Sequence, residues 1–418
     1  MENPKVKNYN EDTKMNIWIF NHYATIPSLA GGTRHYDLAK ELIKRGHTVT
    51  IFASSFDHPT RTEKHIHNPD VKILKENIDG IQFIWVKTTP YQKNDWRRIL
   101  NMLSYSVRAY FYAKKLSEKP DVVIGSLMHP FAALIGYLIA RKKKSLFYFE
   151  ERDLWPQTLI DLGKVSAKHP VVKVLSWLER FLYRKAHRII VLFDKAVDYI
   201  ESQGISRDKV IYLPNGIDLA RFRDKNLPLP PEHESEMSRL KDKFIAIYSG
   251  THGLANNLDV ILDAAKIIQE KTEEIHFLLV GDGPEKDRLI RRKLQEGLNN
   301  VTFMSPVPKK LIPAILSQVH VGLLPLQNSP VFKWGISPNK LYDYMSSSLP
   351  VILICEVEDK FFLEEFSAGL VVRERFSEKL AEAILALSND REQARLMGVN
   401  AREFVESHHS WDMLAEKF

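Results

Sequence analysis

Short apolar runs alternate with helical patterns along the first half of the chain. The runs are rich in β-branched and aromatic residues, and the stretches between them repeat apolar positions every three or four residues. The sequence predicts strands at residues 16–20, 48–53, 82–86, 121–125, 145–149 and 188–192, and helices at 33–45 and 95–117. Strands separated by helices of this length indicate βαβ units and a parallel sheet that is covered on both faces.

A second series of the same kind starts at residue 244. It predicts strands at 244–250, 275–283, 301–303, 320–326, 350–354 and 369–372. The charged, proline-bearing stretch 223–243 that precedes it is expected to be a surface excursion near a domain boundary, and the loop 56–80 gives no clear pattern. We therefore predict two doubly wound α/β domains, with the ligand beyond the carboxyl ends of the strands in a cleft between them.

The chain length supports two domains. At 418 residues it exceeds the size at which single cores usually stop growing, and 44% of the residues are hydrophobic. We predict an N-terminal domain at 15–213, a C-terminal domain at 214–400, and a C-terminal helix at 401–418 that packs back toward the first domain.

Charge and cysteine content restrict the possible partners and compartment. The net charge of +7 favours an anionic partner without choosing among nucleic acid, lipid and small substrates. Cys355, the single cysteine, lies in an apolar run and is expected to be a buried thiol, which fits a reducing compartment. The polar N-terminus has no apolar segment of a signal peptide, and the apolar run 130–140 is too short to span a bilayer, so we expect a soluble or peripheral protein.

Glycine-bearing turns follow three of the predicted strands. They contain Gly31 and Gly32, then Gly250, then Gly281 and Gly283. Glycine lets backbone amides approach a phosphate closely, although any single turn of this kind is also ordinary strand-to-helix geometry. Three such turns together favour an anionic ligand.

The stretch "GISPNKLYDYMSSSLPV" (335–351) predicts a short helix with Lys340 and Asp343 in its first turns. A helix N-terminus has unpaired amides and a partial positive charge, so anions bind there. We interpret the stretch as a phosphate-binding site in which Lys340 neutralises charge. The alternatives are an i,i+3 ion pair between the two side chains and compensation of the helix charge by Asp343.

Several other ligand classes lack their motifs. "AGGTRH" is not the G-x-G-x-x-G of dinucleotide-binding proteins, and no P-loop sequence is present. The chain also has no D-x-D, HExxH or CxxC sequence, and His408 and His409 are adjacent on a predicted helix end, where neighbouring side chains do not face each other. We therefore expect neither a metal site nor another cofactor.

The motifs together resemble the GT-B glycosyltransferases of family four. The resemblance lies in "YSGTHGLANNLDVILDAA", "HFLLVGDGPEKDRL", "VTFMSPVPKKLIPAILSQVHVGLLPL", "GISPNKLYDYMSSSLPVI", "GGTRHYDLAKELIKRGHTVTIFAS", "EERDLWPQT" and "LPNGIDLARF", and it covers almost the whole chain from residue 15. The S-P-x-K-L-x-[DE]-Y-M pattern is similar to that of the subgroup of bacterial O-antigen and exopolysaccharide N-acetyl-fucosamine transferases. The resemblance implies a GT-B fold with an acceptor-binding domain at 15–213 and a nucleotide-sugar-binding domain at 214–400. It also implies a UDP-linked sugar donor, retention of anomeric configuration, and contact of Asp343 with the ribose hydroxyls.

The resemblance also implies site residues. The donor-binding set it suggests is Gly31, Gly32, Gly250, Thr251, Gly281, Gly283, Val307, Ser337, Pro338, Asn339, Lys340, Leu341 and Asp343. The chain departs from the family pattern at Gly335, which stands where the family has a glutamate on the donor sugar, and at Thr251 and Asn256, which stand where the family has Arg and Lys. Lys340 is then the remaining cation for the diphosphate.

The catalytic expectation follows from the charge of the leaving group. A departing diphosphate needs its charge stabilised by a metal or by protein groups, and with no D-x-D we expect Lys340 and backbone amides to do so. The loop "EERDLWPQT" places Glu150, Glu151, Arg152 and Asp153 where donor sugar and acceptor meet, and we expect Glu151, Arg152 or Asp153 to contact the sugar. An ion-paired structural loop is the alternative.

The stretch 94–116 interleaves aromatic residues with cations, and 140–144 adds four more. The cations of the first stretch are Arg97, Arg98, Arg108, Lys114 and Lys115. A basic amphipathic helix suits an anionic membrane surface and a lipid-linked acceptor, whereas a packed core helix with a solvated face is the alternative. No nucleic-acid-binding module is recognisable.

We therefore predict a cytoplasmic, peripheral enzyme that moves a sugar from a UDP-type donor to a saccharide or polyprenyl-diphosphate-linked acceptor in cell-surface polysaccharide synthesis. A UDP-N-acetylhexosamine 2-epimerase and a non-catalytic nucleotide-sugar sensor remain alternatives. The sequence does not identify the donor sugar, the acceptor or the linkage.

Overall fold

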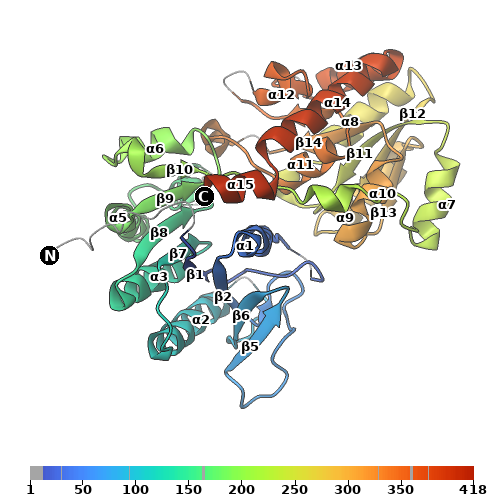
Figure 1. Cartoon of the computed structure of the whole chain (residues 1–418). Coiled ribbons are helices and arrows are strands. Elements are labelled where there is room, and N and C mark those ends of the chain that lie inside the picture. Colours follow the sequence, from blue (N-terminus) through green and yellow to red (C-terminus); the bar gives the residue numbers. More distant parts are fainter. Residues whose placement is uncertain are drawn as a thin grey trace. The chain divides into compact units, whose positions relative to one another are not determined.

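The computed structural model of the chain describes residues 13–29, 31–93, 95–161, 165–327, 329–357, 361–374 and 376–418, with only the backbone of Val331 and Lys333. These residues form two compact units (Figure 1). Unit 1 comprises the described residues up to Pro214 together with Trp334–Ile336 and Leu414–Phe418. Unit 2 comprises Asn215–Lys333 and Ser337–Met413.

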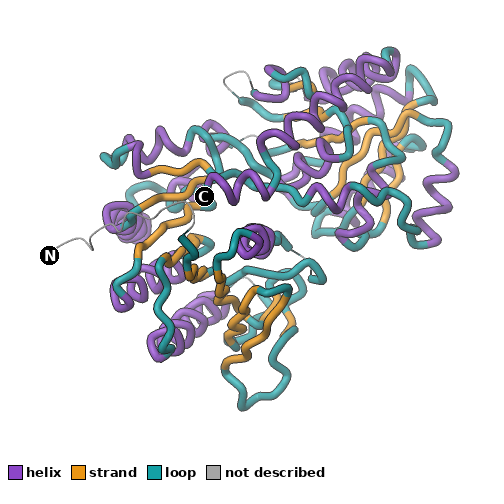
Figure 2. The backbone as a smooth tube through the Cα atoms, in the orientation of Figure 1, coloured by secondary structure: helices purple, strands orange, loops and turns teal. Residues whose placement is uncertain are grey.

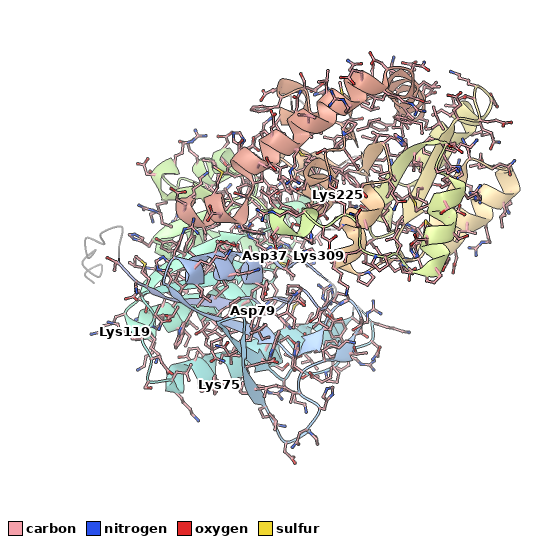
Figure 3. The ribbon with its side chains drawn as sticks, turned by 45° about the vertical axis from the view of Figure 1, so that its right-hand side comes forward. Asp37, Lys75, Asp79, Lys119, Lys225 and Lys309 are labelled. Atoms are coloured by element: carbon pink, nitrogen blue, oxygen red, sulfur yellow. The ribbon has the colours of Figure 1, made fainter. Side chains whose placement is uncertain are left out.

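An eight-stranded sheet forms the centre of unit 1, in the order β10-β9-β8-β7-β1-β2-β6-β5. Its strands are β1 (Asn16–Phe20), β2 (Thr48–Ser54), β5 (Ile73–Ile78), β6 (Ile81–Val86), β7 (Val122–Leu127), β8 (Leu146–Glu151), β9 (Arg188–Val191) and β10 (Val210–Tyr212). All neighbouring strands are parallel except β5 and β6, which form a hairpin that carries Lys75 and Asp79 (Figure 3). The chain order reverses between β1 and β7, and ligands of doubly wound sheets bind at such a point.

Helices cover both faces of this sheet. They are α1 (Arg34–Lys44), α2 (Trp96–Lys115), α3 (Pro130–Lys143), α4 (Gln157–Asp161), α5 (Pro170–Lys185) and α6 (Ala196–Ser202), with the short helix η1 (Arg207–Lys209). The helix α2 packs against α3, and α3 packs against α5, so the three helices form one layer along one side of the sheet, opposite α1 (Figure 1). The central strands are buried along almost their whole length, and most of their residues are apolar, because both of their faces are covered.

Unit 2 contains a six-stranded parallel sheet in the order β13-β12-β11-β14-β15-β16. Its strands are β11 (Phe244–Ser249), β12 (Ile275–Val280), β13 (Val301–Met304), β14 (Val321–Pro325), β15 (Val351–Ile354) and β16 (Gly369–Val372). In register, Ile247 of β11 pairs with Leu278 of β12 on one side and with Gly322 of β14 on the other. The chain order reverses between β11 and β14, as it does at the corresponding place in unit 1.

The helices of unit 2 complete the alternation of strand and helix (Figure 2). The α-helices are α7 (Pro231–Arg239), α8 (Asp259–Gln269), α9 (Lys286–Glu296), α10 (Ile312–Leu316), α11 (Asn339–Ser346), α12 (Phe362–Glu365), α13 (Phe376–Asn389), α14 (Arg391–His408) and α15 (Trp411–Lys417). The short helices are η2 (Leu219–Phe222), η3 (Leu254–Asn256), η4 (Lys309–Leu311) and η5 (Pro330–Trp334). The last residues of η5 and α15 belong to unit 1.

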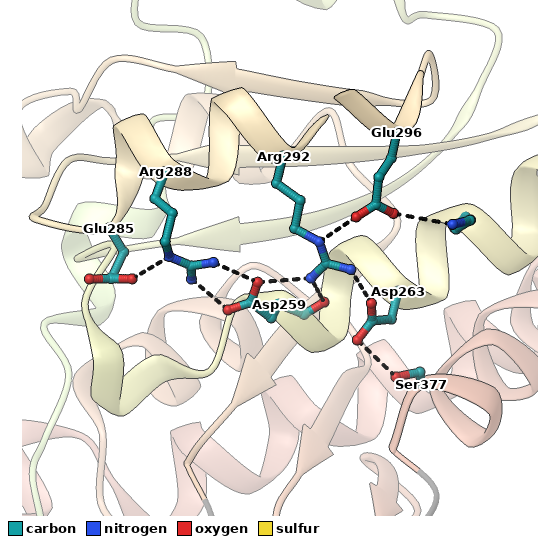
Figure 4. Close-up of polar contacts among 8 residues, drawn as sticks. Asp259, Asp263, Glu285, Arg288, Arg292, Glu296 and Ser377 are labelled. Atoms are coloured by element: carbon teal, nitrogen blue, oxygen red, sulfur yellow. Dashed lines mark hydrogen bonds and ion pairs between the residues drawn. The ribbon is translucent and has the colours of Figure 1, made fainter. Parts of the chain in front are cut away.

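Ion pairs connect α8 and α9 on the surface of unit 2 (Figure 4). Arg292 of α9 reaches Asp259 of α8 at 2.8 Å and also pairs with Asp263, while Arg288 reaches Asp259 at 2.5 Å. Glu285 and Glu296 flank the two arginines from their own helix. Each exposed pair contributes only about 0.2 to 1 kcal/mol, so the network holds the two helices in register and adds little to stability.

The predicted doubly wound α/β class is confirmed in both units, and every predicted strand is present. The stretch 223–243 is not wholly an excursion, because it contains α7. Pro231 opens this helix at a position where its missing N–H costs nothing, and Glu232 and Glu234 lie in its first turn, where negative charge is favourable. The loop 56–80 contains a hairpin of β3 (Phe56–Asp57) and β4 (Thr62–Glu63) as well as β5.

Candidate functional site

One candidate site lies where the strand order of unit 2 reverses. The strand β11 ends there at Ser249, and the backbone N–H of Ser249 donates to the hydroxyl of Tyr344 in α11 at 2.8 Å. This bond joins α11 to the carboxyl end of β11. The first turn of α11 therefore lies beside the glycine turn that follows β11.

Lys340, in the first turn of α11, points into this corner. Its Nζ donates to the hydroxyl of Tyr248 at 2.8 Å and to Oδ1 of Asn256 at 3.0 Å. Tyr248 and Asn256 both donate in turn to the carbonyl of Thr251, at 2.7 and 2.9 Å. Burial lowers the pKa of Lys340 to about 8, so the amine is still mostly protonated at pH 7. The site thus holds a partly desolvated positive charge, whose hydrogen-bond partners among the described residues are neutral.

Gly250 provides the space for this amine. A Cβ at Gly250 would stand 3.1 Å from Nζ of Lys340, and the backbone φ of +151° also favours glycine. Gly281 and Gly283 serve a different purpose, because a Cβ at Gly281 would lie 1.9 Å from the carbonyl oxygen of Gly250 and one at Gly283 would lie 2.4 Å from that of His252. These two glycines let the turns after β11 and β12 pack backbone against backbone.

Asp343 does not pair with Lys340. Its carboxylate pairs with Arg221 of η2, and burial raises its pKa while Arg221 and Lys309 (Figure 3) lower it. Arg221 donates to Oδ1 of Asp343, so Oδ2 is the oxygen that can accept a hydrogen bond from a ligand hydroxyl. The alternative of an i,i+3 ion pair within α11 is therefore not what the described structure contains.

The residues before α11 fix the position of the helix. Ser337 accepts a hydrogen bond from the backbone N–H of Asn215 at 3.3 Å through its hydroxyl, and one from the side chain of Asn215 at 2.8 Å through its carbonyl. No side chain among the described residues caps the N-terminus of α11, where Pro338 stands. The other members of the predicted donor set are placed as follows: Asn339 is exposed, Leu341 is buried, Val307 is half-buried after β13, and Thr251 is exposed.

Gly335, where the sequence departs from the family pattern, belongs to unit 1. Its φ is +103°, and a Cβ there would lie 2.8 Å from Oδ1 of Asp194. A glutamate at this position would be strained and would meet a carboxylate. The structure therefore gives a physical reason for the glycine.

His252 is a residue that the sequence analysis missed. It is fully buried beside the glycine turns, and neither of its ring nitrogens has a hydrogen-bond partner in the described part of the chain. Burial together with the charge of Lys286 lowers its pKa to about 4, so the ring is neutral. Its position directly after a glycine turn was the available signal.

Unit 1 has a candidate site of its own, a pocket of about 310 Å³. Loops after β1, β2, β7 and β8 line it, so it lies at the carboxyl ends of the strands. Gly31, Gly32, Arg152 and Asp153 of the predicted set are among its lining residues. The lining also includes residues that the sequence analysis did not assign to a site: His22, Tyr23, His65, Trp85 and Trp155.

Two histidines meet where the strand order of unit 1 reverses. His22 follows β1, His129 follows β7, and Nδ1 of His22 lies 2.8 Å from Nε2 of His129. The backbone N–H of Ala132 donates to Nδ1 of His129, so in the neutral ring the proton is on Nε2 and is donated to His22. Burial lowers the pKa of both rings, that of His129 to about 3. Both are neutral at pH 7.

Glu150 is a structural residue. Its carboxylate accepts hydrogen bonds from Nε of Arg34 at 2.8 Å and from Nε2 of His35 at 2.7 Å, and all three side chains are buried. Burial alone would raise its pKa, but His35 and Arg34 hold it well below the usual value. Arg34 also donates to the carbonyls of Leu213 and Pro214, at 2.8 and 2.6 Å. Glu150 thus fixes the segment through which the chain leaves unit 1.

Glu151 is also buried and does not line the pocket. It accepts from the hydroxyl of Tyr183 at 2.8 Å, and Tyr183 is shared with Glu179 at 3.1 Å. Burial and the neighbouring Glu179 raise the pKa of Glu151 well above its usual value, which favours the protonated form. A buried side chain in this position does not support contact of Glu151 with a substrate. Arg152 and Asp153 remain as the residues of the loop that we expect to contact the sugar.

The cations of α2 do not all lie on one surface. Arg97, Lys114 and Lys115 are exposed, whereas Arg108 is partly buried and donates to the carbonyl of Lys87. Arg98 lines the pocket, with its guanidinium 5.9 Å from the centre of the Tyr23 ring. Its Nε is buried, and neither a hydrogen-bond partner for Nε nor an ion pair of Arg98 is found within the described residues. We therefore reassign Arg98 from the predicted membrane set to the pocket.

The described residues were considered as metal ligands and as membrane-spanning helices, and they form neither. Among the described residues, no group of three or more His, Cys, Asp and Glu side chains is arranged to hold a metal ion. None of the described helices has the length and apolarity that crossing a membrane requires.

Comparisons with known proteins identify relatives of both halves of the chain. The family model described as Glycosyltransferase Family 4 matches residues 31–221, and the model described as Glycosyl transferases group 1 matches residues 243–390. A curated relative is the glycosyl transferase WcaI of Escherichia coli (strain K12), whose name assigns it to colanic acid biosynthesis; it is 24% identical over 296 residues, which are 69% of this chain and 72% of WcaI.

Solved structures show the fold. Sucrose-phosphate synthase from Thermosynechococcus elongatus superimposes with a TM-score of 0.73 at 18% identity, over 96% of this chain and 97% of that one. HepE of Anabaena in complex with UDP-glucose superimposes with a TM-score of 0.67 at 14% identity, again over 96% and 97%.

Proposed function

We propose that this chain, which is a glycosyltransferase with the GT-B fold, transfers a sugar from a UDP-linked donor to a saccharide or lipid-linked acceptor. The observation that carries the proposal is the protonated amine of Lys340, held without a counterion in the described structure at the carboxyl end of β11. A fixed, partly desolvated cation at a topological switch point is suited to bind a diphosphate. We place the donor site in unit 2.

The chemistry of the donor requires such a charge. Breaking the bond between sugar and diphosphate leaves negative charge on the phosphate oxygens, and groups that are already oriented stabilise it without reorganisation. The N-terminus of α11 adds its partial positive charge to that of Lys340, and no side chain in the described structure caps it. Asp343 supplies an acceptor for the ribose hydroxyls, because one of its oxygens is free of Arg221.

We propose that catalysis needs no metal ion and that the anomeric configuration is retained. The absence of D-x-D from the sequence and the presence of Lys340 support the first point. The resemblance to family four supports the second, and in that case the leaving phosphate itself can accept the proton of the acceptor hydroxyl. Arg152 and Asp153, which line the pocket of unit 1, are the residues of their loop that we expect near the reacting sugar.

We place the acceptor in the pocket of unit 1. At about 310 Å³ the pocket is within the usual range of ligand sites, and the half-buried rings of Tyr23 and Trp155 in its lining are apolar surfaces on which sugar rings can pack. Arg98 brings a guanidinium that forms no ion pair in the described structure. A carboxylate or phosphate on the acceptor is therefore the partner that we expect for Arg98.

The biological setting is a finer proposal. The S-P-N-K-L-Y-D-Y-M sequence at 337–345 supports an N-acetylhexosamine-type donor, of the kind used by N-acetyl-fucosamine transferases. The relative named for colanic acid biosynthesis supports a role in cell-surface polysaccharide synthesis, such as that of O-antigen or exopolysaccharide. Lipid-linked acceptors of such syntheses would place the enzyme at the cytoplasmic face of the membrane.

The test is to incubate the purified chain with radiolabelled UDP-sugars and a bacterial membrane extract, with and without EDTA. Label that enters the lipid or saccharide fraction, undiminished by EDTA, is the expected result. Lys340→Met is the inactive control, and Lys379→Met, at an exposed lysine of α13, is the matched active one. Label that moves only between epimers would favour the 2-epimerase, and binding of UDP-sugar without any turnover would favour a sensor.

A further inference from the structure

The helix α2 carries apolar side chains on its outer face. Trp96 is 62% exposed and Phe111 is 55% exposed, and between them lie Ile99, Leu103 and Val107, each of them more than a third exposed. The spacing of three or four residues puts them on one stripe. The opposite face, which includes Tyr105, Ala109 and Ala113, is buried in the unit, so the stripe is additional to the helix face that forms the core.

The helix α5 repeats this arrangement. Val171, Val174 and Trp177 follow one another at intervals of three residues, and Trp177 is 63% exposed. Its buried face contains Val172, Leu182 and other side chains. The helices α2 and α5 flank α3 in the same layer (Figure 1), and on each of them the exposed stripe lies on the side away from the buried residues.

The charged side chains of this layer are almost all positive. The exposed cations are Arg97, Lys114, Lys115, Arg141, Lys142, Lys173, Arg180, Arg184 and Lys185. The helices α2 and α3 contain no acidic residue, and the only acid of α5, Glu179, is buried against Tyr183 and Tyr199. None of these cations forms an ion pair with another described residue. The acids nearest in sequence are Asp95, which caps α2, and Glu118, which follows it.

We infer that the outer face of α2, α3 and α5 docks on an anionic lipid bilayer, with Trp96, Phe111 and Trp177 entering the headgroup region. Aromatic side chains prefer this boundary, and the surrounding lysines and arginines are attracted to anionic headgroups. Nucleic acid would attract the cations through its negative charge, but it would not bury the apolar stripes. A bilayer accommodates the stripes and the cations at the same time.

The position of Arg98 connects this face to the pocket. Trp96 and Ile99 point outward from the first turn of α2, while Arg98 between them lines the pocket of unit 1. A bilayer on the outer face would therefore lie within about one helical turn of the pocket. This part of the inference rests on the proposed function, because it assumes that the pocket receives a lipid-linked acceptor, whereas the docking itself does not.

The test is sedimentation of the purified chain with vesicles of phosphatidylcholine, with and without phosphatidylglycerol, at low and high salt. Wild-type protein is expected to bind the anionic vesicles and to be released by salt, since exposed charges are screened. The variant Trp96→Ser/Phe111→Ser/Trp177→Ser and the variant Lys114→Glu/Lys115→Glu should each bind at least roughly tenfold more weakly. The matched control is Leu254→Ser/Leu294→Ser in unit 2, where both leucines are about as exposed as the tryptophans.

UDP binding and circular dichroism of each variant are measured in the absence of vesicles. They show whether the variants are folded, and they separate a failure of docking from a failure of the proposed function. Absence of binding to anionic vesicles, or equal binding by wild type and the aromatic variant, would overturn the inference. So would a dimer in gel filtration that the aromatic variant dissociates, because the face would then be occupied by a second copy.

Discussion

Replacing Lys340 by methionine separates the functional role of this residue from its structural role. Burial lowers the pKa of the amine from 10.5 to about 8. Each unit corresponds to about 1.36 kcal/mol, so keeping the charge in this place costs the folded protein on the order of 3 kcal/mol. Methionine has a similar length and carries no charge. The variant therefore does not lose free energy by burying a charged group at this position.

We expect Lys340→Met to raise the free energy of unfolding by about 1 to 3 kcal/mol at pH 7. The lower figure allows for the lost hydrogen bonds to Tyr248 and Asn256 and for the solvent that reaches the partly buried amine. The same change should weaken UDP binding and slow transfer by about a hundredfold, since a charged group that contacts the diphosphate contributes about 3 kcal/mol. Stability and function should thus change in opposite directions.

The dependence of stability on pH provides an internal check. The pKa of Lys340 is lower in the folded state than in the unfolded state, so between about pH 8 and pH 10.5 the unfolded chain binds more protons. The free energy of unfolding of the wild type should therefore rise across this window relative to that of the variant, and the difference seen at pH 7 should shrink.

Urea unfolding monitored by circular dichroism, and titration calorimetry with UDP, provide the two measurements. Lys379→Met, at an exposed ion pair with Glu382, should change neither by more than about 0.5 kcal/mol. A Lys340→Met protein that is less stable than the wild type while it binds UDP equally well would refute the reasoning, because the lysine would then be a structural residue.

Three further substitutions test other parts of the two sites. Asp343→Asn keeps the shape of the side chain but loses the charge that faces Arg221. It should raise the Kd for UDP about tenfold in calorimetry and leave kcat at saturating donor within about threefold. A larger loss in kcat than in binding would contradict a ribose contact. Gly281→Ala should lower the free energy of unfolding by at least about 2 kcal/mol in urea, because its Cβ would stand 1.9 Å from a backbone oxygen, and a neutral effect would show that the two turns are not packed as described. Arg98→Gln should raise the KM for the acceptor about tenfold, while Arg291→Gln, at an exposed arginine of α9 in unit 2, leaves it unchanged; equal effects of the two would mean that Arg98 acts only through surface charge.

The fold was predictable because its signal is local. Strands such as β15 are buried along their whole length and therefore appear in the sequence as uninterrupted apolar runs. The helix α7 was missed because its prolines and charges resemble those of a loop, although Pro231 at the first helical position and the acids that follow are also signals of a helix start. The stretch 337–343 could be proposed as a site from the sequence because its residues are adjacent there.

The roles of the other predicted residues depend on which way their side chains point, and the sequence does not show this. The strand β8 extends to Glu151, two residues beyond the predicted end, so Glu150 and Glu151 point to opposite faces of the sheet. One meets Arg34 and the other meets Tyr183, which leaves Arg152 and Asp153 at the strand end. Other contacts could not be predicted because they join residues that are far apart in the sequence.

The histidines are an example of such a separation. His22 and His129 are 107 residues apart, yet they touch because they follow β1 and β7, which are neighbours only once the sheet has formed. The same applies to Lys340 and Asn256, which are 84 residues apart. Sequence reasoning could place each of these residues at a strand end or helix start, but not beside its partner.

The charge states of the two units lead to one expectation for the pH dependence of transfer. In unit 1 the pKa values of His22, His35 and His129 are all lowered, chiefly by burial, so these imidazoles stay neutral across the physiological range. In unit 2 Lys340 is the group whose pKa, about 8, lies near that range, and the groups around it, Tyr248 and His252, are neutral at pH 7. The donor should therefore bind with constant affinity between pH 6 and pH 7.5.

Above pH 8 the amine of Lys340 loses its proton, and kcat/KM for the UDP-sugar should fall about tenfold per pH unit. The basic limb should be absent from Lys340→Met, whose remaining activity depends on other groups. If activity instead fell on acidification with a midpoint near pH 6.5, and His22→Gln removed that limb, an imidazole rather than the lysine would be the titrating group. The assignment of the diphosphate charge to Lys340 would then fail, because this assignment requires that the cation of the site be the group that titrates.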